Sequence, residues 1–151
     1  MLIGLMSVLV VLVLLAAGLM FKLGSDSRRM IVSVGVVEGR LMACPSTPNC
    51  VSSDAPPADS HYIAPIADPA GAKWSGLVAT VQRMPGAALI EQRHDYAYFT
   101  FTTGFWRFVD DVEFHHRAQA GEIAIRSASR VGQGDWGANR SRLEAVRAML
   151  E

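Results

Sequence analysis

Four segments in the second half of the chain alternate between apolar and polar residues, and only short turns separate them. They cover residues 87–93, 96–102, 105–116 and 122–131. Alternation at a period of two places successive side chains on opposite faces of a β-strand. Because turns this short join only antiparallel neighbours, the four segments predict a four-stranded antiparallel meander.

Two predicted helices flank the meander. The first begins at Asp68-Pro69, where a capping aspartate precedes a proline at the first helical position. The second, at the C-terminal end, is capped by Asp135 or Asn139. Apolar residues recur at helical spacing in both segments, at Trp74, Leu77, Val78, Val81 and Met84 and at Leu143, Val146 and Leu150. The predicted fold class is therefore α+β, with a four-stranded antiparallel meander covered on one face by two helices.

An uncharged apolar run occupies residues 2–21 and predicts a single N-terminal transmembrane helix before the domain. Twenty helical residues span about 30 Å, the thickness of the hydrocarbon core of a bilayer. No basic residue precedes the run, so the basic region of a signal peptide is missing. Cleavage near Ala16-Ala17-Gly18 stays open, but the length of the run favours a retained anchor. We divide the rest of the chain into a stalk over residues 22–40 and a domain over residues 41–151.

The orientation of the anchor follows from two opposing signals. Lys22, Arg28 and Arg29 follow the apolar run, and the positive-inside rule alone would keep the domain in the cytoplasm. Long domains translocate regardless of charge, however, and a cysteine pair favours an oxidising compartment. We expect a single-pass protein of the bacterial inner membrane with a periplasmic domain. Its expected partners are the lipid bilayer, through residues 2–21, and a membrane protein.

The charge balance argues against nucleic acid as a partner, and we expect none. The chain has 14 basic and 14 acidic residues and a formal net charge of zero. Nucleic-acid-binding domains normally carry a basic face, and this composition provides none.

The two cysteines of the chain, Cys44 and Cys50, lie close together in a segment bent by two prolines and an asparagine. A disulfide, two free thiols and a metal site are the three alternatives. Structural zinc pairs usually lie two to four residues apart and need two more ligands, and His61 is the one imidazole nearby. We expect the disulfide.

Polar residues gather on the third and fourth predicted strands. Strand alternation puts Asp111 and Glu113 on the same face as Arg126 and Arg130. Asp110 points to the opposite, apolar face, where a carboxylate is costly unless it is paired or hydrogen-bonded. The residues expected to reach Asp110 are Ser127, Ser129, Asn139 and Arg140.

This polar set has two main interpretations. In the first, it is a buried network that fixes the last helix to the sheet. In the second, the glycine-rich turn at residues 132–137 and the helix N-terminus that follows it form a site for an anion or small polar ligand. Arg130 and Arg140 would then hold the ligand, and an acidic residue would orient it or act as a base. The candidate binding residues are Asp110, Asp111, Glu113, Arg126, Ser127, Ser129, Arg130, Asp135, Asn139 and Arg140.

Other site classes have weaker support in the sequence. A metal site on the acidic residues is disfavoured because neighbouring residues on a strand point apart. No P-loop, HExxH motif or catalytic-triad spacing is present, so we predict no catalytic residue, metal or cofactor. The glycines at 132, 134 and 137 do not form a dinucleotide-binding fingerprint, since no βαβ unit follows them.

Several motifs together resemble the DUF1499 family, a group of uncharacterised bacterial and plastid proteins. The motifs are residues 44–53, residues 108–114 and residues 126–132, followed by Asp135, Gly137, Asn139, Arg140 and Arg142. The resemblance covers about residues 41–150 and leaves the apolar N-terminal run outside it. It implies a shared domain, and it suggests that the polar set belongs to the common design of that domain.

The leading functional expectation is a membrane-anchored domain that binds a small polar or anionic ligand, or a partner protein, at the sheet–helix junction. An enzyme is the first alternative, with Asp110 or Glu113 as the base and Arg130 and Arg140 as an anion clamp. The second alternative is an accessory subunit of a membrane protein complex.

Overall fold

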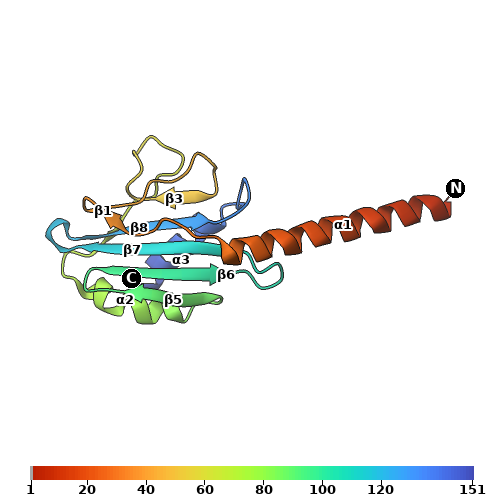
Figure 1. The fold of residues 1–151 in the computed structure, drawn as a ribbon. Coiled ribbons are helices and arrows are strands. Elements are labelled where there is room, and N and C mark those ends of the chain that lie inside the picture. Colours follow the sequence, from red (N-terminus) through yellow and green to blue (C-terminus); the bar gives the residue numbers. More distant parts are fainter. Residues whose placement is uncertain (1) are drawn as a thin grey trace.

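The computed structural model describes residues 2–151 as an α+β domain with a long N-terminal helix projecting from one end (Figure 1). The helices are α1 (Leu2–Arg29), α2 (Ala72–Gln82) and α3 (Ala138–Met149), with a 3-10 turn at Ala118–Ala120. The strands of the main sheet are β3 (Cys50–Ser52), β4 (Ile66–Ala67), β5 (Ala87–Gln92), β6 (Tyr96–Thr102), β7 (Val109–Arg117) and β8 (Glu122–Ser129). A separate small hairpin contains β1 (Val36–Val37) and β2 (Arg40–Leu41).

The main sheet has six strands, and the prediction of four was wrong. The strand order is β3-β8-β7-β6-β5, and β4 also pairs with β8. All of these pairs are antiparallel, as expected for the central meander. The two additional strands are only three and two residues long. Segments this short show no periodicity, so the sequence pattern could not identify them.

The third strand begins at Val109, whereas the prediction began it at residue 105. Residues 103–108 instead form a loop that closes on itself. The backbone N–H of Thr103 donates to the Phe108 carbonyl, and the Phe108 N–H donates to the Thr103 hydroxyl, both at 2.9 Å. Arg107 adopts a φ of 61°, in the left-handed region, and this conformation cannot continue a strand.

Helix α2 begins at Ala72 rather than at the predicted Pro69. A left-handed Gly71 precedes it, with a φ of 70°. Asp68 still satisfies the helix N-terminus, because its carboxylate accepts hydrogen bonds from the backbone N–H groups of Lys73 at 3.0 Å and Trp74 at 2.8 Å. The residue chosen for the cap was therefore right, and the first turn starts later because the chain bends between Asp68 and the helix.

One core cluster joins α2 and α3 to the sheet. Leu143 and Val146, predicted to share a face of the last helix, are fully buried in it. Each buried aliphatic side chain of this size contributes about 1.5–3 kcal/mol. The cluster also contains Leu77, Val81, Phe99, Phe114, Ile123 and Ile125.

The N-terminal segment after α1 crosses the other face of the sheet. Val34, Val36 and Leu41 pack there against a second cluster that includes Tyr96 and Tyr98. The tyrosines alternate with the core residues of β6, so this cluster lies on the opposite face. Residues 34–41 are thus packed onto the domain (Figure 1).

Helix α1 continues without a break past residue 21 to Arg29. Among the described residues it is the one helix long and apolar enough to cross a membrane. Its apolar side chains from Leu5 to Leu19 are largely exposed. The first residues of the expected stalk therefore extend this helix up to the domain.

Candidate functional site

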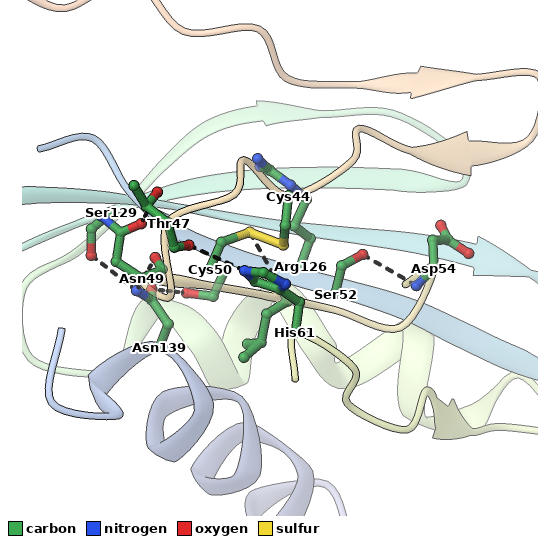
Figure 2. The surroundings of a disulfide bond; sticks show 12 residues. Cys44, Thr47, Asn49, Cys50, Ser52, Asp54, His61, Arg126, Ser129 and Asn139 are labelled. Atoms are coloured by element: carbon green, nitrogen blue, oxygen red, sulfur yellow. Dashed lines mark hydrogen bonds between the residues drawn. A yellow bond between two sulfur atoms is a disulfide. The ribbon is translucent and has the colours of Figure 1, made fainter. Parts of the chain in front are cut away.

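Asn139, in the first turn of α3, joins that helix to two strands. Its side chain is fully buried. The amide nitrogen donates to the Asn49 carbonyl at 3.0 Å and to the Ser129 hydroxyl at 2.9 Å, and the amide oxygen accepts from the Ser127 hydroxyl at 2.5 Å. Figure 2 shows Asn139 beside Asn49 and Ser129. These contacts fix the start of α3 against β3 and β8.

Asp110 points to the core face, as alternation predicts, and its ionic partner is Arg142. The guanidinium Nη2 of Arg142 lies 2.6 Å from Oδ2 of Asp110. The Nη1 atom of Arg142 donates to Ser127 Oγ at 2.9 Å and to Asn139 Oδ1 at 2.8 Å. The guanidinium also lies 4.8 Å from the centre of the Phe101 ring, a cation–π contact. Sequence reasoning missed Arg142, although its spacing of three residues from Asn139 is a signal for a shared helix face.

Arg140, the arginine expected to reach Asp110, points elsewhere. Its Nη2 atom donates to the carbonyls of Ser60 at 3.1 Å and Tyr62 at 2.7 Å. Arg140 thus attaches α3 to the segment between β3 and β4.

Asp111 and Arg130 form a two-pronged ion pair on the opposite face of the sheet. The Nε atom of Arg130 lies 2.9 Å from Oδ2 of Asp111, and its Nη2 atom lies 2.8 Å from Oδ1. Hydrogen bonding to Asp111 raises the pKa of Arg130. The hydroxyl of Tyr98 donates to Asp111 at 2.6 Å, and burial, together with this bond, raises the pKa of Tyr98. These charge-assisted hydrogen bonds hold the guanidinium of Arg130 against Asp111.

Glu113 and Arg126 form a second pair on that face. The Nη1 atom of Arg126 lies 2.7 Å from Oε2 of the fully buried Glu113. Oε1 accepts from the Tyr96 hydroxyl at 2.8 Å and from the Gly35 backbone N–H at 2.6 Å. Burial beside Glu113 raises the pKa of Tyr96. The N-terminal segment therefore seals this pair from solvent.

The Cys44–Cys50 disulfide is present, which confirms the expectation (Figure 2). Cys50 lies in β3 and pairs with Ala128 of β8. Next to it, the Asn49 side chain donates to the Gly132 carbonyl at 2.9 Å. His61 contacts the disulfide loop, because its Nε2 atom lies 3.1 Å from the carbonyl oxygen of Thr47. The short disulfide loop therefore shapes both the edge strand and the glycine-rich turn.

The side chain of Asp135 stabilises the glycine-rich turn and the start of α3. Its carboxylate accepts from the backbone N–H groups of Gly137 at 3.0 Å and Asn139 at 2.8 Å. Burial alone would raise the pKa of Asp135, but these hydrogen bonds outweigh it and lower the pKa. Asp135, rather than Asn139, therefore satisfies the N-terminus of α3. Trp136, next to it, is fully exposed and has a φ of 55°.

The C-terminal end of α1 is fixed to the end of the sheet that carries the glycine-rich turn. The buried Ser27 hydroxyl accepts from the Val109 N–H at 2.8 Å, and Arg130 donates to the Ser27 carbonyl at 3.2 Å. A Cβ atom added to Gly24 would lie 2.0 Å from the Trp106 carbonyl oxygen. Only glycine permits this close approach between the helix and the 103–108 loop.

A pocket of about 370 Å³ lies between the end of α1, the 103–108 loop and the glycine-rich turn. Asp110, Ser129 and Asp135 line it beside apolar residues, including Met20 and Leu23 of α1. A larger hollow of about 690 Å³ lies between the end of α2, β6 and α3, and includes Arg142. Of the candidate residues, Asp110, Ser129 and Asp135 line the first of these cavities. Asp135 and Arg140 line a smaller one of about 140 Å³ beside the disulfide loop. Arg126 and Arg130 face their carboxylate partners.

The comparisons with known proteins identify a family and no function. The model of the DUF1499 family, described as a protein of unknown function, matches residues 40–150. No curated protein and no solved structure matches the chain. The matched region includes the disulfide loop, the whole main sheet and α3, and α1 precedes it. The chain belongs to the DUF1499 family.

Proposed function

We propose that this protein is a membrane-anchored binding domain whose pocket-bearing end faces the bilayer. The ligand is a small polar molecule or a partner protein, bound at the junction of α1, the sheet and α3. The observation that carries the proposal is the position of α1: its apolar helix ends against the domain and forms one wall of the pocket. The cysteine bridge supports a periplasmic domain, because disulfides persist in oxidising compartments.

Exposed aromatic residues at this end of the domain support its placement at a membrane surface. Phe105 is 71% exposed and Trp136 is fully exposed. The Phe105 ring also contacts Phe21, at the end of the apolar run, with the ring centres 5.9 Å apart. Phe105 lies in the 103–108 loop and Trp136 in the glycine-rich turn. Figure 1 shows these two segments at the end of the sheet from which α1 leaves. Tryptophan and other aromatic side chains concentrate at bilayer interfaces.

Packing within the domain does not explain why Trp136 has a left-handed backbone conformation and an exposed side chain. A bulky residue in the left-handed region is unfavourable, and here the conformation carries an indole into solvent. Burial of that indole in the head-group region of a bilayer supplies the missing compensation.

The two alternative functions have different support. The enzyme proposal relied on an arginine anion clamp, but Arg130 binds Asp111 and Arg140 binds backbone carbonyls. We therefore place a neutral polar ligand ahead of an anionic one. The accessory-subunit proposal is supported by α1, whose apolar surface is open along its length to lipid or to another membrane protein.

Depth-dependent fluorescence quenching tests the proposal. The full chain is placed in vesicles of phosphatidylcholine brominated at the acyl chains. One variant retains only Trp136 (Trp74→Phe with Trp106→Phe), and its matched control retains only Trp74. Trp74 hydrogen-bonds to the His94 carbonyl in the turn before β6, at the opposite end of the strands from the 103–108 loop. Seven strand residues separate the two ends by about 20 Å.

We expect strong quenching of Trp136 and little quenching of Trp74. Equal quenching of the two residues, or release of the protein from the vesicles by alkaline carbonate, would contradict the proposed anchoring and orientation.

A further inference from the structure

The pocket between α1 and the glycine-rich turn has the features of a site for an amphiphile. We infer that it binds a molecule with a neutral or cationic head group that donates hydrogen bonds, of the long-chain alcohol or amine class, taken from the bilayer surface. This inference rests on the proposed membrane anchoring and names the ligand class for that site.

The walls of the pocket are mostly apolar and come from three separate segments. Its volume of about 370 Å³ lies within the range of small-molecule sites. The apolar lining residues are Met20, Leu23, Phe108, Val109, Val131, Trp136 and Ala138. Such walls match an alkyl chain and gain from removing it from water.

Asp110 gives the pocket a polar end with one oxygen free to accept. The side chain of Asp110 is only 7% exposed, and its Oδ2 atom binds Arg142. Within residues 2–151, its Oδ1 atom has no hydrogen-bond partner. A carboxylate only accepts hydrogen bonds, so a ligand that satisfies this oxygen must donate one.

The charge of the pocket selects against an anionic head group. Asp110 and Asp135 both line it, and among the described residues no lysine or arginine does. Arg142 approaches Asp110 from the larger hollow on the other side of the carboxylate. A fatty-acid carboxylate would meet two like charges, whereas an alcohol or an amine would meet acceptors.

The position of Met20 and Leu23 connects the pocket to the bilayer. Both residues lie within one helical turn of Phe21, where the uncharged apolar run ends. With residues 2–21 in the hydrocarbon core, the mouth of the pocket lies at the head-group level. An amphiphile can then enter with its chain along α1 and its head toward Asp110.

Photolabelling of the full chain in phosphatidylcholine nanodiscs tests this inference. Three ten-carbon probes carry the same chain diazirine and differ only in an alcohol, amine or carboxylate head group. Labelled peptides are mapped by mass spectrometry. We expect the alcohol and amine probes to label residues 108–110 and 129–138, and excess unlabelled 1-decanol to abolish this labelling. The carboxylate probe should label these residues about tenfold less, the scale of one hydrogen bond to a charged group.

Two variants distinguish a loss of binding in the pocket from a loss of folding. Asp110→Asn should reduce the difference between the alcohol and carboxylate probes, because Asp135 then remains as the one like charge among the described lining residues. Ala138→Leu adds side-chain volume to the pocket wall and leaves both Asp110 and Arg142 in place. It should lower labelling even if Asp110→Asn does not fold. Ala79→Leu, the same substitution at an exposed position of α2, is the matched control and should label like the unsubstituted chain.

Three results would overturn the inference: equal labelling by all three head groups, labelling that 1-decanol does not displace, or full labelling of Ala138→Leu. Carbonate extraction of the same samples reports the anchoring separately. A chain that stays in the membrane but shows one of these results refutes the ligand assignment alone.

Discussion

The guanidinium of Arg142 in α3 lies 2.6 Å from the carboxylate of Asp110 in β7, and this pair joins the last helix to the middle of the sheet. Removing one partner of a buried pair leaves an uncompensated charge and costs about 3–5 kcal/mol. We therefore expect Arg142→Ala to lower the free energy of unfolding by about 3 kcal/mol.

Arg140→Ala is the matched control for that prediction, because in the part of the chain that the structure describes Arg140 hydrogen-bonds only to backbone carbonyls. Its expected loss is about 1 kcal/mol. Chemical denaturation in non-ionic detergent, followed by tryptophan fluorescence, measures both variants. A loss as large for Arg140→Ala as for Arg142→Ala would contradict the assignment of Arg142 as the partner of Asp110.

Gly24 predicts a second difference between two similar substitutions. Alanine at this position would bring a methyl group 2.0 Å from the Trp106 carbonyl oxygen, so α1 and the 103–108 loop must separate. At Gly18 nothing lies within 4 Å. Since alanine favours a helix over glycine by about 1 kcal/mol, Gly18→Ala should be neutral or stabilising. Gly24→Ala should lower the melting temperature and change the Trp106 emission, and unchanged emission would argue against the close contact.

Reduction of the Cys44–Cys50 bridge should destabilise the domain moderately. The loop between the cysteines is short, so the loop-entropy formula gives about 2 kcal/mol. A reductant, or the paired substitution Cys44→Ser with Cys50→Ser, should lower the melting temperature by about 4–8 °C. In freshly isolated cells neither cysteine should react with a thiol reagent until a reductant is added. Freely reactive thiols would contradict the periplasmic location.

His61 should make the disulfide loop sensitive to pH. The hydrogen bond to Asp59 raises the pKa of His61, so the protonated imidazole favours the folded state. This stabilisation is fully present below the ordinary histidine pKa of about 6.5 and is lost as the pH rises through the folded-state value. His61→Gln should therefore lower the melting temperature by about 3 °C at pH 5 and by less at pH 9.

His115 affects the pH dependence of stability in the opposite direction, so His61→Gln must be compared with the unsubstituted chain at each pH. Burial lowers the pKa of His115, so its protonation at acid pH favours unfolding in both proteins. A difference between the two proteins that grows toward pH 9 would contradict the role given to His61.

Strand alternation predicted the central meander because its strands are long and bury one face each. It failed at residues 105–108, where Trp106 and Phe108 alternate as strand residues do. There the left-handed Arg107 breaks the strand, and the Trp106 ring contacts Phe21 of α1, with the ring centres 5.1 Å apart. A contact between residues so far apart in the chain leaves no local pattern, so tertiary structure overrides the strand signal.

The sequence predicted which face of the sheet each candidate side chain lies on, but it predicted only some of the residues that these side chains contact. Alternation places Asp110 apart from Asp111 and Glu113, as the structure has them. At about 100° per residue, Arg140 and Arg142 flank the buried stripe of α3 on opposite sides. Which flank faces Asp110 depends on the direction in which α3 crosses the sheet. That direction follows from contacts with the segment before β4, which the helix sequence does not contain.

We expect the contacts at Ser27 and Gly24 to make α1 and the sheet move as one rigid unit. Membrane helices change tilt when the bilayer changes thickness. The eight residues of β8 extend about 26 Å, so a tilt of about 10° would swing the distant turns by about 5 Å. In the anchored state, the thickness of the membrane would thereby set how far those turns lie to the side of the point where α1 enters it.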